Sequence, residues 1–127
     1  MMSPEKSNDK SKSKECIFCK IVQGTLPSEK VFENEKVFAF KDISPQTPVH
    51  VLIVPKKHIG DVLDVRAEDA HIFSDLFQAV QFIAPQLGIA GPGFRCVFNS
   101  GDHACQTIYH VHLHLLGGMQ MGGSMVG

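Results

Sequence analysis

Short runs of β-prone residues, separated by turn-forming residues, recur along most of the chain and predict strands. Asn34 and Glu35 lie between the first two runs, which indicates a hairpin there. Pro55 closes the third run because proline cannot donate to a sheet ladder. The predicted strands cover residues 30–33, 36–41, 49–54, 94–99 and 110–116.

Two other segments show the intervals of three and four residues that are typical of helices. The first covers residues 15–22 and is stopped by Gly24 and Pro27. The second covers residues 67–84, and Pro85 should end or kink it. Its apolar residues form one stripe that we expect to face the core. The stripe consists of Ile72, Phe73, Leu76, Phe77, Val80 and Ile83.

The order of these elements is helix, strands, helix, strands. Neighbouring strands are joined by short connections, which favour antiparallel pairing over a parallel arrangement with crossover helices. A chain of 127 residues supports one domain with a single core. The pattern therefore predicts a single α+β domain.

Composition and charge exclude several classes of partner. No apolar run approaches the roughly 20 residues needed to span a bilayer, so we expect a soluble protein. The formal net charge of −1 offers no field that would steer the chain onto nucleic acid or an anionic membrane. A small ligand that carries a phosphate remains compatible with this charge.

Residues 1–14 are polar and charged, contain no stretch that resembles a secretory signal, and are predicted to form a disordered tail. The cytoplasm or nucleus is the expected location. In such a reducing compartment we expect thiols or metal ligands rather than disulfides. The cysteines in question are Cys16, Cys19, Cys96 and Cys105. Cys96 is expected in the core.

Three histidines, His110, His112 and His114, stand at alternate positions near the end of the chain. On a strand, they would project from one face about 7 Å apart. Histidine can act as acid, base, nucleophile or metal ligand near neutral pH. A half-exposed edge strand with a histidine-rich polar face is the alternative. We interpret the cluster as a functional face.

The residues around this cluster resemble the histidine triad (HIT) family, and in particular its Hint branch of histidine triad nucleotide-binding proteins, once described as protein kinase C interacting proteins. The resemblance covers residues 16–121. Its motifs are residues 41–46 (KDISPQ), 55–59 (PKKHI), 109–118 (YHVHLHLLGG) and 120–121 (QM).

The resemblance implies a fold and an activity. The fold would be a five-stranded antiparallel sheet with one long and one short helix, in a homodimer whose sheets join across a two-fold axis. The HIT domain would cover residues 15–121, followed by a flexible tail at 122–127. Family members bind purine nucleoside monophosphates and hydrolyse nucleoside phosphoramidates, for which AMP that bears an amine on phosphorus is the model substrate.

The resemblance also implies site residues. Positions similar to Phe18, Leu26, Asp42 and Ile43 form the base and ribose pocket. Positions similar to Asn99, Gln106, Thr107, His112 and His114 hold the phosphate and the reacting centre. His112 would be the nucleophile, and His50, which matches a family histidine near the triad, is our candidate for an outer proton relay.

Plain structural roles remain open for several of these residues. Asp42 could be only a turn residue, since Asp readily bonds nearby backbone. His50 could be a strand histidine that faces solvent, and Asn99 and Gln106 could be loop residues. His71 is expected on the surface of the long helix, and His103 is left unassigned.

The chemistry follows from the residue types. Attack by a neutral nitrogen of His112 on phosphorus would give a nucleotidyl-histidine, which divides a difficult displacement into two easier ones. The other ring nitrogen should be held as N–H by a carbonyl or a similar acceptor. His114, Gln106 and the Thr107 hydroxyl could donate to the phosphate oxygens, and a neighbouring imidazolium to the leaving amine. No metal is demanded by this mechanism.

Cys16 and Cys19 have a spacing that allows two thiolates to meet one metal, although redox or packing cysteines share it. Members of the HIT family that carry these cysteines use two histidines as further ligands. One follows the Pro-Lys-Lys segment, and the other is the first triad histidine. By that resemblance, His58 and His110 would complete a closed structural zinc site.

Some positions depart from the family pattern. Lys41 stands where a histidine is frequent before the ribose-binding acid, and Thr107 where serine is common. Residues 104–105 (AC) replace frequent glycines, which makes the backbone before the triad stiffer. Residues 119–127 lack the tryptophan and prolines that in relatives reach the leaving group. Preference for the amine is therefore open.

A hydrolase of nucleoside phosphoramidates is the leading interpretation. The alternative from another class is a nucleotide-binding regulatory or scaffold protein with vestigial catalysis and regulatory protein partners. A third interpretation takes the three histidines as ligands of a catalytic metal. Another nucleotidyl hydrolase or transferase activity of the same superfamily also remains open.

Overall fold

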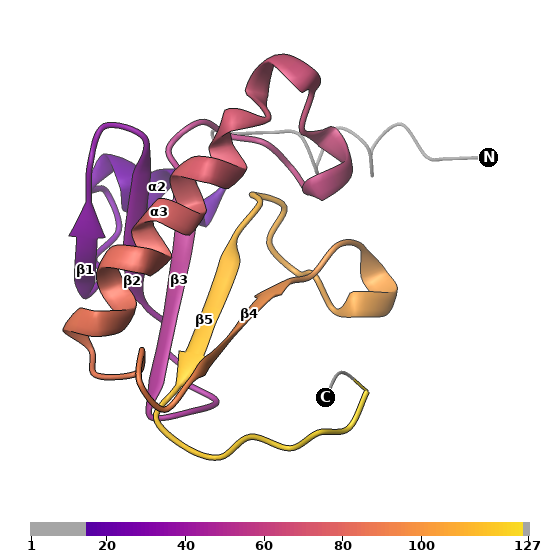
Figure 1. Ribbon diagram of the computed structural model, residues 1–127. Coiled ribbons are helices and arrows are strands. Elements are labelled where there is room, and N and C mark those ends of the chain that lie inside the picture. Colours follow the sequence, from indigo (N-terminus) through magenta and orange to yellow (C-terminus); the bar gives the residue numbers. More distant parts are fainter. Residues whose placement is uncertain (1–14, 126–127) are drawn as a thin grey trace.

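The computed structural model describes residues 15–125, which form one five-stranded sheet between two helices (Figure 1). The strands are β1 (Lys30–Glu33), β2 (Val37–Lys41), β3 (Val49–Pro55), β4 (Phe94–Phe98) and β5 (Leu113–Gly117). The helices are α2 (Ile17–Gln23) and α3 (His71–Gln86). Single 3₁₀ turns occur at Val62–Asp64, Ala67–Asp69 and Asp102–Ala104. The predicted α+β architecture is confirmed, whereas the predicted disordered tail 1–14 lies outside the described residues.

All strand pairs are antiparallel, and the order in the sheet is β1-β2-β3-β5-β4. The predicted hairpin is β1 and β2, where the Asn34 side chain accepts hydrogen bonds from the backbone N–H groups of Lys36 (2.8 Å) and Val37 (2.9 Å). The pairing of β3 with β5 aligns Leu52 with His114. This register places His114 on an interior strand of the sheet, beside β3.

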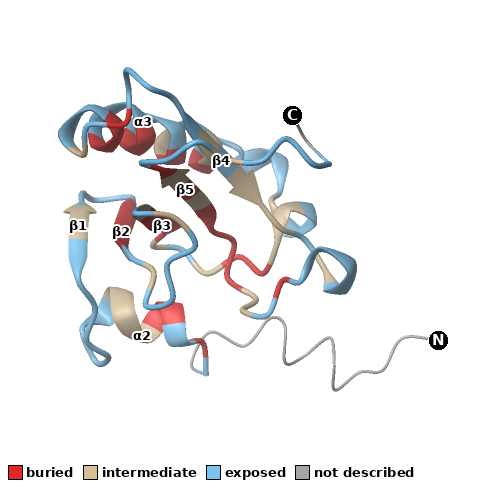
Figure 2. Ribbon diagram, turned by 90° about the horizontal axis from the view of Figure 1, so that it is seen from below, coloured by how far each residue is buried: buried red, intermediate tan, exposed pale blue. Residues whose placement is uncertain are grey.

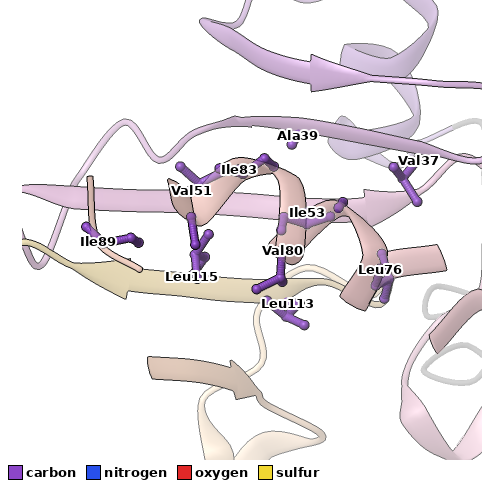
Figure 3. Packing of buried hydrophobic residues seen from close by; sticks show 12 residues of the cluster. Val37, Ala39, Val51, Ile53, Leu76, Val80, Ile83, Ile89, Leu113 and Leu115 are labelled. Atoms are coloured by element: carbon purple, nitrogen blue, oxygen red, sulfur yellow. The ribbon is translucent and has the colours of Figure 1, made fainter. Parts of the chain in front are cut away.

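The two faces of the sheet carry different residues because side chains alternate along each strand. Figure 2 shows α3 on one side of the sheet and α2 on the other. Val51 and Ile53 of β3 face α3, whereas Leu52 and Val54 belong to the cluster under α2. The α3 side is a continuous apolar core (Figure 3). The α2 side is where polar groups are found.

The core beneath α3 joins the helix to the three central strands. Leu76, Val80 and Ile83 of α3 pack against β3 and β5 (Figure 3). The predicted stripe is correct for these residues and Ile72, but Phe77 is 43% exposed and Phe73 only partly buried. Two alanines that were not predicted in the stripe, Ala79 and Ala84, are buried and complete the core-facing side of the helix.

The long helix begins and ends later than predicted. Residues Ala67–Asp69 form a separate 3₁₀ turn, and α3 starts at His71. Pro85 lies inside the last turn, and the helix continues through it to Gln86. The backbone N–H of Leu87 still donates to the carbonyl of Ile83 at 3.0 Å. Proline at position 85 removes one donor but leaves this terminal hydrogen bond intact.

The last strand is shorter than predicted, because β5 begins at Leu113 and not at His110. Its partner β3 ends at Pro55, and the backbone N–H of Val111 donates instead to the carbonyl of Ile59, at 2.7 Å. His110 and His112 therefore precede the strand, on a segment that pairs with the chain after β3.

Cys96 is exposed and not in the core as predicted. It lies on β4, an edge strand with a neighbour on one side only. Within residues 15–125, no helix combines the length and apolar character that crossing a membrane requires.

Candidate functional site

Four histidines gather on the α2 side of the sheet. His50 comes from β3, His114 from β5, and His110 and His112 from the segment just before β5. The residues between the triad histidines, Val111 and Leu113, point into apolar clusters. The alternation predicted from the sequence therefore holds for the triad, although only its last member lies within the strand.

His112 is held in one orientation by the main chain. Its Nδ1 lies 2.7 Å from the carbonyl oxygen of His110, so Nδ1 carries the hydrogen and Nε2 has a free lone pair. The ring of Phe18 meets it edge-on, with centroids 5.0 Å apart. Burial lowers the pKa of His112, while the His110 carbonyl and the charge of Asp42 partly oppose this shift. The residue is therefore a neutral imidazole at neutral pH, in the tautomer that nucleophilic attack by Nε2 requires.

His50 and His114 form a hydrogen-bonded pair beside His112. The backbone N–H of Gln46 donates to Nδ1 of His50 at 3.0 Å, so in the neutral ring the proton is on Nε2. That Nε2–H faces Nδ1 of His114 at 2.9 Å. His114 must then accept at Nδ1 and carry its own hydrogen on Nε2. The order of donors is Gln46, His50, His114.

Burial governs the protonation of this pair. Burial and the neighbouring His112 and His50 lower the pKa of His114 to about 4, although the charge of Asp42 acts in the opposite direction. Burial also lowers the pKa of His50, against the same opposing charge. His114 is therefore a neutral N–H donor at neutral pH. His112 and His114 lie side by side, with ring centroids 5.0 Å apart.

Asp42 follows β2 and has two contacts. Its Oδ1 accepts a hydrogen bond from the backbone N–H of Ser44 at 2.8 Å, which is the turn role left open above. Its Oδ2 lies 3.5 Å from Nε2 of His50. The side chain therefore both stabilises the turn and faces the histidines.

The other positions assigned to the base and ribose pocket differ in burial. Phe18 is buried and contacts His112. Leu26 is 37% exposed and Ile43 is 98% exposed. Phe18 and Asp42 are thus the two pocket positions that contact the histidine cluster directly, and the roles of Leu26 and Ile43 remain predictions.

Gln106 is buried and anchors the loop before the triad. Its Oε1 accepts from the backbone N–H of Gly101 at 3.0 Å, and its Nε2 donates to the carbonyls of Gly60 (3.0 Å) and Ile108 (3.2 Å). Both amide hydrogens are therefore engaged by the backbone, which supports the loop role for Gln106. A contact with phosphate remains a prediction for it and also for Asn99, which is half-buried, and Thr107, which is exposed.

Cys16, Cys19, His58 and His110 bring their donor atoms within 4.8 Å of one another. His110 Nδ1 lies 3.4 Å from the sulfur of Cys16 and 3.5 Å from that of Cys19, and His58 Nδ1 lies 3.3 Å from the sulfur of Cys19. A tetrahedral zinc site with ordinary bond lengths has S···N distances of about 3.6 Å. The four residues therefore fit a zinc ion.

Further contacts prepare these ligands. His110 Nε2–H donates to the carbonyl of Pro55 at 2.7 Å, which leaves the Nδ1 lone pair directed at the cysteines. Burial lowers the pKa of His110 to about 4, so the ring is neutral. Burial and the adjacent Cys16 raise the pKa of Cys19 to about 12. A thiol of this kind needs a cation, such as zinc, to become a thiolate at neutral pH.

A second group with possible metal ligands is Asp42, His50 and His114. Metal binding here would need a lone pair on Nε2 of His50. The Gln46 N–H occupies Nδ1, however, and therefore places the proton on Nε2. These residues fit a hydrogen-bond relay better than a metal site. In residues 15–125, no group of possible ligands joins all three triad histidines, as a catalytic metal on the triad would require.

A sequence-family model of the HIT domain matches residues 23–121. The chain belongs to the HIT domain family. This match confirms the resemblance seen in the sequence. Similar proteins and a similar solved structure agree with this assignment.

Adenylylsulfatase HINT1 of Arabidopsis thaliana is 47% identical over 83% of this chain and 72% of its own length. The purine nucleoside phosphoramidase of Escherichia coli K12 is 43% identical over 87% of the chain and 92% of its own length. A protein of Brassica juncea named 14 kDa zinc-binding protein is 45% identical, over 83% and 94% of the two chains. The solved structure of a HIT family hydrolase from Legionella pneumophila Philadelphia 1 is 43% identical and superposes with a TM-score of 0.85, over 89% of this chain and all of that one.

Sequence reasoning missed the main-chain groups of the site. The carbonyls of His110 and Pro55 and the N–H of Gln46 fix three imidazoles. Every residue type offers such groups, so no residue pattern could identify them. The mechanism expected from the sequence did require an acceptor for one ring nitrogen of His112, and the His110 carbonyl is that acceptor.

Proposed function

We propose that this HIT protein is a purine nucleoside phosphoramidase that hydrolyses the P–N bond of adenosine 5′-phosphoramidates through a nucleotidyl-histidine intermediate on His112. The supporting observation is the hydrogen bond of 2.7 Å from His112 Nδ1 to the His110 carbonyl, which leaves Nε2 free to attack. The name of the Escherichia coli relative, purine nucleoside phosphoramidase, supports the same activity.

In the first step, Nε2 of His112 forms a bond to the α-phosphorus while the bond from phosphorus to the amine breaks. The amine leaves with the P–N electron pair and needs a proton. His114 Nε2–H is the adjacent donor, and the His50 Nε2–H holds the ring of His114 through its Nδ1. Transfer of the His114 proton leaves the His50–His114 pair one proton short beside the positively charged nucleotidyl-His112. Water then attacks phosphorus and returns one proton to the pair, AMP leaves with the new P–O bond, and His112 becomes neutral again as its bond to phosphorus breaks.

The rest of the site binds and orients the nucleotide. Phe18 offers an aromatic edge beside His112 for the base, and Asp42 offers a carboxylate for the ribose hydroxyls. The phosphate oxygens lie against the loop that Gln106 anchors, with the Thr107 hydroxyl and Asn99 as donors. Leu26 and Ile43 complete the rim of the base and ribose pocket.

Zinc is proposed as a structural ion held by Cys16, Cys19, His58 and His110. It would tie the start of α2 to the segment after β3 and to the triad, and it takes no part in the chemical steps. The distances between sulfur and nitrogen atoms support this assignment, as does the name of the Brassica juncea relative.

A homodimer in the cytoplasm or nucleus is proposed as the working form. The backbone of the edge strand β4 has a free side, and Phe94 of this strand and Phe77 of α3 are both substantially exposed. Pairing of β4 with a second copy would cover both features. Light scattering coupled to size exclusion should give twice the mass of one chain, and a monomer at micromolar concentration would contradict the dimer.

Substitution of the nucleophile tests the function. In His112→Asn, turnover of an adenosine phosphoramidate should fall by at least about a thousandfold because the covalent step is lost. AMP binding, measured by calorimetry, should persist. His71→Asn is the matched control, because His71 is exposed on α3, and its turnover should equal that of the wild type. Undiminished turnover in His112→Asn would refute the mechanism.

A second candidate is a nucleotide-binding regulatory or scaffold protein with vestigial catalysis and protein partners. The loop before the triad favours it, because Cys105 has a left-handed backbone conformation and the Gln106 amide is fully used by the main chain. Micromolar AMP binding without turnover of the phosphoramidate would support this candidate. Adenylyl sulfate belongs in the same assay, since the Arabidopsis thaliana relative is named for its cleavage.

A further inference from the structure

The loop between β2 and β3, residues 42–48, approaches His50 at both nitrogens. The Gln46 N–H donates to Nδ1 at 3.0 Å, and the Asp42 carboxylate oxygen Oδ2 lies 3.5 Å from Nε2. The same Nε2 faces Nδ1 of His114 at 2.9 Å. One loop therefore fixes the tautomer of His50 and places a carboxylate beside the nitrogen that donates to His114.

We propose that Asp42 is a positioning residue for the hydrogen bond from His50 to His114, so that one carboxylate links ribose recognition to the proton donor. The inference rests on the proposed function, in which Asp42 binds the ribose hydroxyls and His114 protonates the leaving amine. It adds that the ribose affects the rate of the chemical step and not only binding of the substrate.

The turn geometry leaves Asp42 little freedom. Oδ1 accepts the Ser44 N–H at 2.8 Å, which directs Oδ2 toward the histidine pair. A ribose hydroxyl that donates to this carboxylate would reduce the negative charge seen by His50 and would hold the side chain still. Whether the sugar carries that hydroxyl should therefore influence how His50 and His114 are aligned.

Two titratable groups besides its own members face the pair, His112 and Asp42. His112, from the segment before β5, has its ring centroid 5.0 Å from that of His114. Lys41, at the end of β2, alternates with Phe40 and therefore lies on the α3 side of the sheet, where it pairs with Glu29 at 2.8 Å. Asp42 is thus the anionic group directed at the pair.

Asp42→Asn isolates the charge, because an asparagine Oδ1 can still accept the Ser44 N–H and preserve the turn. Kinetics should be measured with adenosine phosphoramidate and with its 2′,3′-dideoxy analogue. A residue that only binds ribose would have no effect on the analogue, which lacks both hydroxyls. A positioning residue should lower kcat for the analogue about tenfold and shift the limb of the pH profile that reports His50 and His114 to lower pH.

Asp69→Asn is the matched control. Asp69 pairs with Lys57 on the 3₁₀ turn before α3 and has no contact with the histidine pair, so its pH profile should match the wild type. An unchanged kcat for the analogue in Asp42→Asn would overturn the proposal.

Nitrogen-15 spectra of the labelled protein test the positioning role independently of turnover. In the wild type, His50 and His114 should both carry their hydrogen on Nε2, and their titration midpoints should move to lower pH in Asp42→Asn. A His50 that carries its hydrogen on Nδ1 would overturn the proposal. If the wild type cleaves neither substrate, the proposed function fails, and unchanged midpoints would then overturn the positioning role as well.

Discussion

At the scale of single residues, the site depends on which atom of each imidazole carries the hydrogen. The main chain determines this for His112 and for His110, whose acceptors are the carbonyls of His110 and Pro55. For His50, the determining group is the Gln46 N–H. Three rings of the same chemical type thus receive defined tautomers from backbone atoms that the fold places beside them, and these tautomers suit the proposed roles of metal ligand, nucleophile and relay.

Cys105 is a residue whose backbone opposes its side chain. It has φ of 64°, in the left-handed region that favours glycine. Cys105→Gly should raise the free energy of unfolding by about 0.5–1 kcal/mol, because the steric penalty of a side chain in this conformation exceeds the entropy that glycine loses on folding. Urea denaturation measures the change.

The neighbouring Ala104→Gly is the control for Cys105→Gly. Ala104 lies in the 3₁₀ turn, outside the left-handed region. Glycine there should lower the free energy of unfolding by about 0.5–1 kcal/mol. Equal losses of stability in the two variants would contradict the strain assigned to Cys105.

At the scale of elements, α2 is short and depends on neighbours outside itself. It has seven residues, with Cys16 as its N-cap and Phe18 and Cys19 as its buried side chains. A helix of this length is marginal alone in water. Its stability must come from packing on β2 and β3 and from the cluster of cysteines and histidines, so the proposed zinc is a structural part of the element that places Phe18 against His112.

Removal of one zinc ligand should therefore loosen α2. Wild-type protein purified without chelator should contain close to one zinc per chain, and Cys19→Ser should lose most of it. The melting temperature of Cys19→Ser should fall, with about 2 kcal/mol or more of unfolding free energy lost, because bound metal stabilises only the folded state. Metal analysis and calorimetry measure both effects.

Cys96→Ser is the matched control for Cys19→Ser, since Cys96 is exposed on β4. It should keep both its zinc and its melting temperature. A wild-type protein without zinc, together with thiols of Cys16 and Cys19 that react freely, would contradict the metal site.

At the scale of the whole molecule, the site makes stability depend on pH. Burial lowers the pKa of His114 to about 4 and also lowers that of His50, below the usual value near 6.5 of an unfolded chain. The unfolded chain therefore binds more protons below pH 6.5. The contribution of these two histidines to the unfolding free energy should be fully present above pH 6.5 and should fall as the pH drops from 6.5 toward 4.

Each such proton contributes a slope of at most about 1.4 kcal/mol per pH unit. Urea denaturation at a series of pH values should show this slope. His114→Gln should reduce it, and His71→Gln, at an exposed position on α3, should leave it unchanged. A stability that is flat between pH 4 and 6.5 would contradict the neutral, buried pair.

Much of the fold could be predicted from the sequence because its local signals agree with the final contacts. The β-prone runs in residues 30–54 form β1, β2 and β3, and the spacing of Leu76, Val80 and Ile83 matches the observed burial. The errors arose where distant partners decide. Cys96 is exposed because β4 is an edge strand, and His110 precedes β5 because the pairing with β3 stops at Ile53 and the pairing with β4 stops at Phe98, both opposite Leu113.

The candidate site shows the same division. Residue types and their spacing identified the triad and the two cysteines. The structure brings the cysteines together with His58 and His110. The side-chain amide of Gln106 instead holds its own loop. That outcome depends on the carbonyls of Gly60 and Ile108, which a list of residue types does not contain.

The acceptor for His112 is a main-chain oxygen, so the tautomer of His112 does not depend on the side chain at position 110. Any amino acid at that position offers the same carbonyl to Nδ1, whether or not it can ligate zinc. A lineage could therefore lose His110 and both cysteines, stabilise the N-terminal helix by other packing, and still keep an attacking nitrogen in its reactive tautomer. The proposed metal site and the proposed nucleophile are thus neighbours in space that evolution can separate.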